Sequence, residues 1–141
     1  MERLVVDASV IVKWYINEKY SEKALKLRDK HVNGEILLMA PSLLPYEVIN
    51  ALRYSNLYTL EELKLATASL LNYGIQTQPI TSKYMEKVVE VAVKNGITIY
   101  DASYIALAIT KNVKMVTSDE KLIERVKPET RKIIIHIKEI Q

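Results

Sequence analysis

The sequence predicts an α/β fold of three layers, in which a central parallel sheet of about five strands is flanked by helices on both faces. Segments with the hydrophobic period of a strand alternate with segments with the period of a helix along the whole chain. Several strand segments are short and continuously apolar, which is typical of a parallel sheet covered on both faces. The 141 residues contain no linker, internal repeat or low-complexity tract, so we expect a single domain over residues 1–141.

The first four predicted elements lie in the first third of the chain. A β-branched strand over residues 3–8 (RLVVDA) is followed by a short helix over 9–16 (SVIVKWYI), for which Ser9 is the expected N-cap. A second helix over 21–32 (SEKALKLRDKHV) leads to an apolar strand over 35–41 (EILLMAP), whose final proline prevents its continuation.

Two further helices follow this strand. Residues 42–56 (SLLPYEVINALRYSN) predict a helix that tolerates Pro45 because the proline lies in its first turn. Residues 59–74 (TLEELKLATASLLNYG) predict a helix that begins with a capping box, formed by Thr59 and Glu62, and ends at a glycine.

The next three elements repeat the alternation. A short strand over 75–80 (IQTQPI) precedes a helix over 81–96 (TSKYMEKVVEVAVKNG), which stops at Gly96. The following helix, over 101–112 (DASYIALAITKN), has Asp101 as its expected N-cap.

The last three predicted elements are a strand over 113–118 (VKMVTS), a short helix over 119–126 (DEKLIERV) and a final strand over 132–140 (KIIIHIKEI). Right-handed crossovers place the C-terminal ends of all parallel strands at one edge of the sheet. Ligands of α/β folds bind at that edge.

Composition excludes several classes of protein. The absence of cysteine excludes disulfides and thiolate chemistry. No apolar run approaches the roughly 20 residues that a membrane-spanning helix needs, and Asp7 interrupts the apolar start that a signal peptide requires. We therefore expect a cytoplasmic protein without a membrane partner. The net charge of +3 is compatible with a polyanionic partner but does not by itself indicate one.

Four acidic residues lie where this topology gathers functional groups. Asp7 and Asp119 each follow a strand, Asp101 begins a helix, and Glu47 lies between apolar residues of its helix. Each has a structural alternative, because the three aspartates are good N-caps and Glu47 fits the polar edge of an amphipathic helix. Together they predict crowded carboxylates without an obvious lysine or arginine in each motif, and such carboxylates resist ionising unless a cation is bound.

Carboxylate oxygens are hard ligands, which suit Mg²⁺ or Mn²⁺. Zinc would need histidine or cysteine ligands, but His31 and His136 have no ligand partner at a useful spacing. We expect His31 near the surface at a helix end and His136 in a structural position within its strand.

Polar residues beside the acids are candidates for orienting them. Ser9 follows Asp7 by two residues, and Thr117 and Ser118 precede Asp119, so their hydroxyls can hydrogen-bond a carboxylate or act as N-caps. Asn50 follows Glu47 by three residues and shares its helix face.

Lys13, Arg53 and Lys121 lie near the acids in sequence and are candidates for contacting phosphate groups, although each also fits an ordinary solvated position. Tyr100 and Tyr104 lie beside Asp101, where an aromatic ring can stack on an unpaired base. Packing is the interpretation that we favour for both tyrosines.

Four stretches, taken in order, resemble the PIN-domain family, and specifically the VapC-type toxin ribonucleases of VapBC toxin–antitoxin pairs. They are VVDASVIVKWYINE, PSLLPYEVINAL, IYDASYIALA and MVTSDEKL, and the resemblance extends over nearly the whole chain. It implies a PIN-like fold and a Mg²⁺- or Mn²⁺-dependent endoribonuclease that leaves 5′-phosphate and 3′-hydroxyl ends. It also implies a cognate VapB-type antitoxin and a homodimer. The resemblance assigns catalysis and metal binding to Asp7, Glu47, Asp101 and Asp119, with Ser9, Asn50 and Thr117 beside them.

Two other functions are weighed against the ribonuclease. A haloacid-dehalogenase-like phosphotransferase would need a second aspartate two residues after the first, and Ser9 occupies that position. A non-catalytic PIN-like binding module would not need the intact set of four acids.

Overall fold

The computed structural model describes all 141 residues and has a five-stranded sheet as its central layer. The strand order is β3-β2-β1-β4-β5, and every neighbouring pair is parallel. The expected α/β fold with a five-stranded parallel sheet is therefore confirmed. The strands are β1 (Glu2–Val6), β2 (Ile36–Pro41), β3 (Gln76–Gln78), β4 (Lys114–Thr117) and β5 (Ile134–His136).

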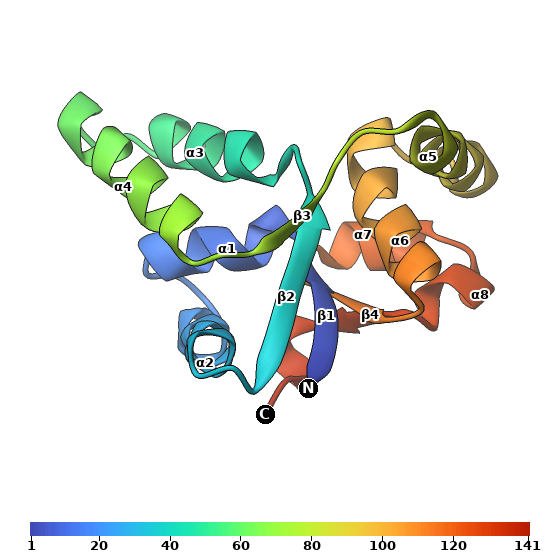
Figure 1. The fold of residues 1–141 in the computed structure, drawn as a ribbon, viewed down its shortest axis with the longest axis horizontal. Helices are drawn as coiled ribbons and strands as arrows, with labels where there is room; N and C mark the ends of the chain where they lie inside the picture. The colour runs from blue at the N-terminus through green and yellow to red at the C-terminus, as the bar shows by residue number, and fades with distance from the viewer.

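Helices cover both faces of the sheet, so the molecule has three layers (Figure 1). Four helices lie on one face: α1 (Ala8–Tyr15), α2 (Ser21–Val32), α3 (Leu44–Tyr54) and α4 (Leu60–Asn72). Four lie on the other: α5 (Ser82–Asn95), α6 (Ile99–Lys111), α7 (Glu120–Arg125) and α8 (Pro128–Arg131). None of these helices combines the length and the apolar composition that crossing a bilayer requires.

The strand order changes direction between β1 and β4. From β1 the chain proceeds outward to β2 and β3, and then returns through α5 and α6 to β4 on the other side of β1. β1 and β4 are paired up to Val6 and Val116, so the two strands end next to each other. In parallel sheets a reversal of this kind opens a crevice at the carboxyl ends of the strands, and ligands bind there.

Helix α6 is the most deeply buried helix. Residues 102–108 are all buried, because one side of α6 packs on the sheet and another side packs on α5. Alanines at 102, 106 and 108 keep the helix thin enough to fit between these layers. The start of α6 is consequently held firmly above the carboxyl ends of β1 and β4.

Most predicted helix signals are present in the structure. Thr59 and Glu62 form the capping box, Thr81 caps α5, and Gly96 ends α5 with a left-handed backbone at φ +62°. Pro45 lies in the first turn of α3. The predicted final strand is shorter than expected, because residues Ile137–Glu139 form a 3₁₀ turn, and α8 was not predicted.

Two predicted caps are wrong. Ser9 lies inside α1, which begins one residue earlier at Ala8. Asp101 lies inside α6, whose N-cap is Thr98: the Thr98 hydroxyl accepts a hydrogen bond of 3.0 Å from the Asp101 backbone N–H. A threonine cap three residues upstream leaves the Asp101 carboxylate available for another role.

We expect Thr98→Ala to lower the free energy of unfolding by about 1 kcal/mol, because α6 loses its only side-chain cap. Urea unfolding monitored by circular dichroism measures this change. Thr98→Ser retains the hydroxyl and is the matched control, so an equal loss in both variants would contradict the capping role.

Candidate active site

Asp7 lies at the carboxyl end of β1 and is only 8% exposed. One of its carboxylate oxygens, Oδ2, accepts hydrogen bonds from the hydroxyls of Ser9, at 2.8 Å, and Thr117, at 2.7 Å. Its side chain makes no capping bond to α1. The alternative role of Asp7 as a side-chain helix cap is therefore not what the structure shows: neutral hydroxyls, and no cationic group, hold the buried carboxylate.

The same hydroxyls connect the ends of β1 and β4. Thr117 Oγ1 accepts a bond of 3.1 Å from the backbone N–H of Asp119, and Ser9 Oγ accepts one of 3.0 Å from the backbone N–H of Ser118. Ser9 and Thr117 thus orient Asp7 as the sequence suggests, whereas the contribution of Ser118 comes from its backbone. This network sets the Asp119 segment relative to Asp7.

Asp119 does act as a helix cap. Its Oδ1 accepts a bond of 3.1 Å from the backbone N–H of Leu122 at the start of α7. The structural alternative for this acid is confirmed, and the bond uses one of the two carboxylate oxygens.

Glu47 and Asp101 approach the same edge from α3 and α6, and both are half-buried. Glu47 Oε1 accepts a hydrogen bond of 2.6 Å from the hydroxyl of Tyr104, which is completely buried. Tyr104 lies one helical turn beyond Asp101 on α6. Burial and the negative charges of Asp7 and Glu47 raise the pKa of Tyr104 far above its usual range, so its hydroxyl remains a proton donor.

The acids affect one another electrostatically. Burial is the main reason that the pKa of Asp7 is raised; the hydroxyls of Thr117 and Ser9 oppose this, and the charges of Asp101 and Asp119 add to it. Burial also raises the pKa of Glu47, to which the charges of Asp7 and Asp101 contribute. The pKa of Asp101 is raised by burial and then by the charge of Asp119.

No lysine, arginine or histidine forms an ion pair with any of the four acids. Arg125 only weakly offsets the raised pKa of Asp101. Asp7 and Asp101 thus act electrostatically on Glu47, and Asp119 acts on Asp7 and Asp101, without an ion pair to a cationic side chain. This is the arrangement that a divalent cation stabilises.

No three side chains of histidine, cysteine, aspartate or glutamate lie close enough together to form a ready-made metal site. The chemistry of the donors nevertheless fits Mg²⁺ or Mn²⁺, because all four are carboxylates and three of them have raised pKa values. The two histidines lie outside this group. His31 hydrogen-bonds the Tyr73 carbonyl and the Leu38 N–H, and His136 is buried in β5 and accepts a bond from the Lys138 N–H.

The basic residues predicted to contact RNA have different surroundings. Lys13 is buried, and its ammonium group forms an ion pair of 3.2 Å with Glu18. Arg53 is exposed on α3 and stacks over the ring of Tyr54, 4.6 Å from the ring centroid. Lys121 is exposed on α7.

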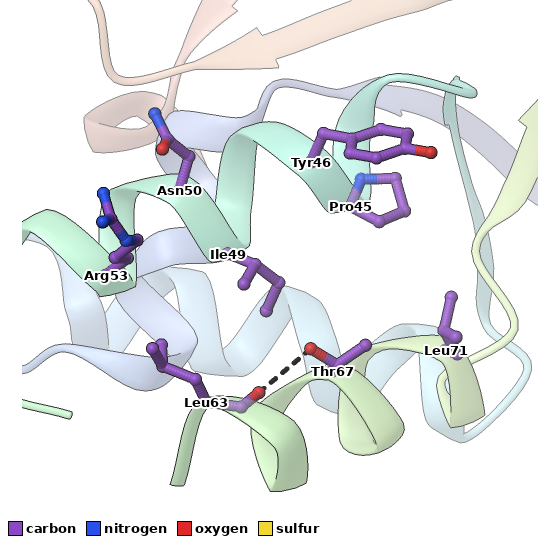
Figure 2. Close-up of a pocket in the computed structure, with 8 residues that line it drawn as sticks. All are labelled: Pro45, Tyr46, Ile49, Asn50, Arg53, Leu63, Thr67 and Leu71. Atoms are coloured by element: carbon purple, nitrogen blue, oxygen red, sulfur yellow. Dashed lines mark hydrogen bonds between the residues drawn. The ribbon is translucent and has the colours of Figure 1, made fainter. Parts of the chain in front are cut away.

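A cavity of about 580 Å³ lies between α3 and α4, and none of the four acids lines it. Figure 2 shows Asn50 and Arg53 on the α3 wall and the side chains of α4 on the opposite wall. Asn50 is exposed on this cavity. The lining residues are Pro45, Tyr46, Ile49, Asn50, Arg53, Leu63, Thr67 and Leu71.

Tyr104 is the residue of the site that sequence reasoning missed. Packing describes its ring, but its hydroxyl also contacts Glu47 across 57 positions of sequence. The available signal was its spacing of three from Asp101, which places both residues on one side of the same helix.

Comparisons with known proteins agree on one family. A family model described as PIN domain matches residues 4–128. Ribonuclease VapC3 from Pyrobaculum aerophilum is 32% identical over 135 residues, and the match covers 87% of this chain and 94% of that protein.

Solved structures have the same fold. The crystal structure of PAE2754 from Pyrobaculum aerophilum matches with a TM-score of 0.62 and 26% identity, covering 97% of this chain and 92% of that one. The crystal structure of VapC20 from Mycobacterium tuberculosis, a toxin that cleaves the sarcin-ricin loop, matches with a TM-score of 0.68. It covers 89% of this chain and 99% of that one at 16% identity, a similarity that concerns the fold alone.

The raised pKa of Asp7 predicts how the stability of the metal-free protein depends on pH. An acid whose pKa is higher in the folded state binds more protons there, so its destabilising effect grows as the pH rises above the ordinary value of 3.8. We expect Asp7→Asn to gain stability relative to the wild type between mildly acidic and neutral pH. Thermal melts in a chelator from pH 5 to pH 8 measure this difference.

The melting temperature of the variant is compared with that of the wild type at each pH, because His136 changes stability with pH in the direction opposite to Asp7. Burial lowers the pKa of His136 below 6.5, so its contribution to stability is lost as the pH falls, equally in both proteins. A melting temperature that is lower in Asp7→Asn than in the wild type throughout the range would assign Asp7 a stabilising structural role.

Proposed function

The chain belongs to the PIN-domain family, and from this premise we propose that it is a divalent-metal-dependent endoribonuclease of the VapC type. In this proposal the protein is the toxin component of a type II toxin–antitoxin system and acts on RNA in the cytoplasm. Its partners are a cognate VapB-type antitoxin and a second copy of the chain in a homodimer.

The observation that carries the proposal is the gathering of four unpaired acids where the strand order reverses. Asp7, Glu47, Asp101 and Asp119 come from four segments: the charges of Asp101 and Asp119 help to raise the pKa of Asp7, and the charges of Asp7 and Asp101 help to raise the pKa of Glu47. The charge of Asp119 also helps to raise the pKa of Asp101. A single helix cap or an isolated surface acid would not produce this mutual effect. The free energy that their repulsion costs the folded protein is regained when a cation binds.

We assign the four acids as the residues that hold Mg²⁺ or Mn²⁺. When bound, the cation supplies the positive charge and the Lewis acidity that phosphodiester hydrolysis by water requires. The chain's own groups orient the carboxylates. The hydroxyls of Ser9 and Thr117 hold the carboxylate of Asp7, and the cap bond from the Leu122 N–H holds the carboxylate of Asp119 at the start of α7.

The chain offers no rival set of groups for covalent catalysis. It has no cysteine, and neither histidine lies with the acids. The hydroxyls of Ser9 and Thr117 both donate to Asp7 and are engaged in orienting it. These contacts favour attack by water over a covalent protein intermediate, and with the 3′ oxygen as the leaving group the products carry 5′-phosphate and 3′-hydroxyl ends.

Phosphate contacts of the substrate are assigned to exposed cations near the acids. Arg53 lies on the helix that carries Glu47, and Lys121 follows Asp119 by two residues. Lys13 is engaged by Glu18, so it contributes less unless that ion pair opens. Asn50, which the sequence placed beside Glu47, lines the cavity with Arg53 and forms no hydrogen bond to Glu47.

We expect Asp7→Asn to reduce RNA cleavage by more than about 100-fold, since loss of a direct ligand should exceed the 10- to 100-fold effect of losing an outer contact. The assay follows cleavage with mapped ends in Mg²⁺, in Mn²⁺ and in a chelator. Asp29→Asn makes the same charge change at an exposed acid of α2 and should leave the rate unchanged. Cleavage that persists in the chelator would contradict metal dependence.

We also expect Mn²⁺ to raise the melting temperature of the wild type, because the cation binds the folded site in preference to the unfolded chain. A concentration of 100 times the dissociation constant adds about 2.7 kcal/mol, or roughly 10 °C for a chain of this size. Asp7→Asn should lose most of this shift and Asp29→Asn should retain it. An equal shift in all three proteins would place the cation elsewhere.

A further inference from the structure

Glu47 depends on a single side chain for its position. The hydroxyl of Tyr104 is the only group that hydrogen-bonds its carboxylate, at 2.6 Å from Oε1. The charged groups that act on Glu47 most strongly are Asp7 and Asp101, and both repel it. A half-buried glutamate with three rotatable bonds turns toward water when its neighbours are negative and nothing holds it.

Tyr104 is anchored more firmly than the glutamate it contacts. Its side chain is completely buried within α6, the helix that packs on both the sheet and α5. The backbone of Ala8 lies close enough to this hydroxyl to oppose the rise in the pKa of Tyr104, as the charges of Asp7 and Glu47 lie close enough to add to it. The hydroxyl therefore lies near the segment of Asp7 while it bonds the carboxylate of Glu47. The ring itself belongs to the helix that carries Asp101.

We propose that Tyr104 is a positioning residue of the active site, whose hydroxyl holds the carboxylate of Glu47 at a fixed place relative to Asp7 and Asp101. The inference rests on the proposed metal-dependent ribonuclease function. It adds Tyr104 to the four acids of the proposed site. Tyr104 acts through Glu47 and does not contact the substrate.

The alternative for a buried tyrosine is that its hydroxyl only stabilises the fold, and the chain contains a matched control for this. Tyr84 on α5 is also buried, and its hydroxyl donates a bond of the same length, 2.6 Å, to the backbone carbonyl of Ser103 on α6. Tyr84→Phe and Tyr104→Phe remove the same atom from the same region. Only Tyr104 contacts an acid of the site.

The first experiment compares the steady-state kinetics of RNA cleavage in the two variants. Tyr104→Phe should lower kcat by about 10- to 100-fold, the range seen when an outer contact of a metal site is lost. Its KM should stay within about twofold, because the hydroxyl contacts neither RNA nor the residues assigned to phosphates. Tyr84→Phe should retain both constants. Equal losses in the two variants, or a Tyr104→Phe variant that no longer folds, would assign the hydroxyl a structural role and overturn the inference.

The second experiment requires no catalysis. The Mn²⁺ concentration that gives half of the maximal rise in melting temperature is measured for the wild type, Tyr104→Phe, Glu47→Ala and the double variant. If Tyr104 acts through Glu47, its replacement raises this concentration in the wild type but changes nothing further in the Glu47→Ala background. Additive effects in the double variant would show that Tyr104 acts independently of Glu47, and would overturn the inference.

The outcomes also separate this inference from the function on which it rests. A wild type that neither cleaves RNA nor responds to Mn²⁺ would overturn the proposed function. A wild type that cleaves RNA, with Asp7→Asn inactive and Tyr104→Phe indistinguishable from Tyr84→Phe, would leave the function in place and overturn the positioning role alone.

Discussion

The buried carboxylate of Asp7 is the constraint on which the rest of the site depends. A negative charge at the end of a central strand is unfavourable in the interior unless groups nearby compensate for it. Here the compensation comes from two hydroxyls, Ser9 and Thr117, and it is incomplete, because the pKa of Asp7 remains raised. The three other acids add charge of the same sign. The folded chain therefore keeps an unfavourable electrostatic state, and in the function that we propose a divalent cation relieves it.

The topology explains why the acids meet. β1 and β4 are neighbours although more than a hundred residues separate them, so Asp7 and Asp119 emerge from adjacent strand ends. α6 lies on one face of the sheet with Asp101 in its first turn, and α3 brings Glu47 from the layer on the other face. Each acid belongs to a different segment, yet the positions of all four follow from the point at which the sheet reverses its strand order. The hydroxyl of Tyr104 links the two layers at that point.

Local signals in the sequence identified most of the elements, because strand composition, capping boxes and terminal glycines depend on neighbouring residues alone. The capping box of Thr59 and Glu62 is an example. Where two residues close in sequence could both cap a helix, the sequence did not decide between them. Both Thr98 and Asp101 are good caps, and the structure uses the threonine, which leaves the aspartate free.

Contacts between distant segments were beyond such reasoning. The strand order and the bond from Tyr104 to Glu47 both depend on tertiary packing that no local pattern records. The positions of the four acids at strand ends and helix starts singled them out, and the resemblance to a known family assigned their roles. The hydroxyls of Ser9 and Thr117 were also candidates from the sequence, whereas the bond from Tyr104 to Glu47 emerged only from the structure. The cavity between α3 and α4 is a further feature of this kind, since its walls come from two helices whose apolar residues individually fit a core.

The burial of α6 on several sides has a consequence for how the site fluctuates. Residues 102–108 are covered by the sheet and by α5, so we expect their amide protons to exchange with solvent mainly through global unfolding. α3 is different, because its outer side faces the cavity shared with α4 and carries exposed side chains. We therefore expect local opening of the site to involve α3 more often than α6.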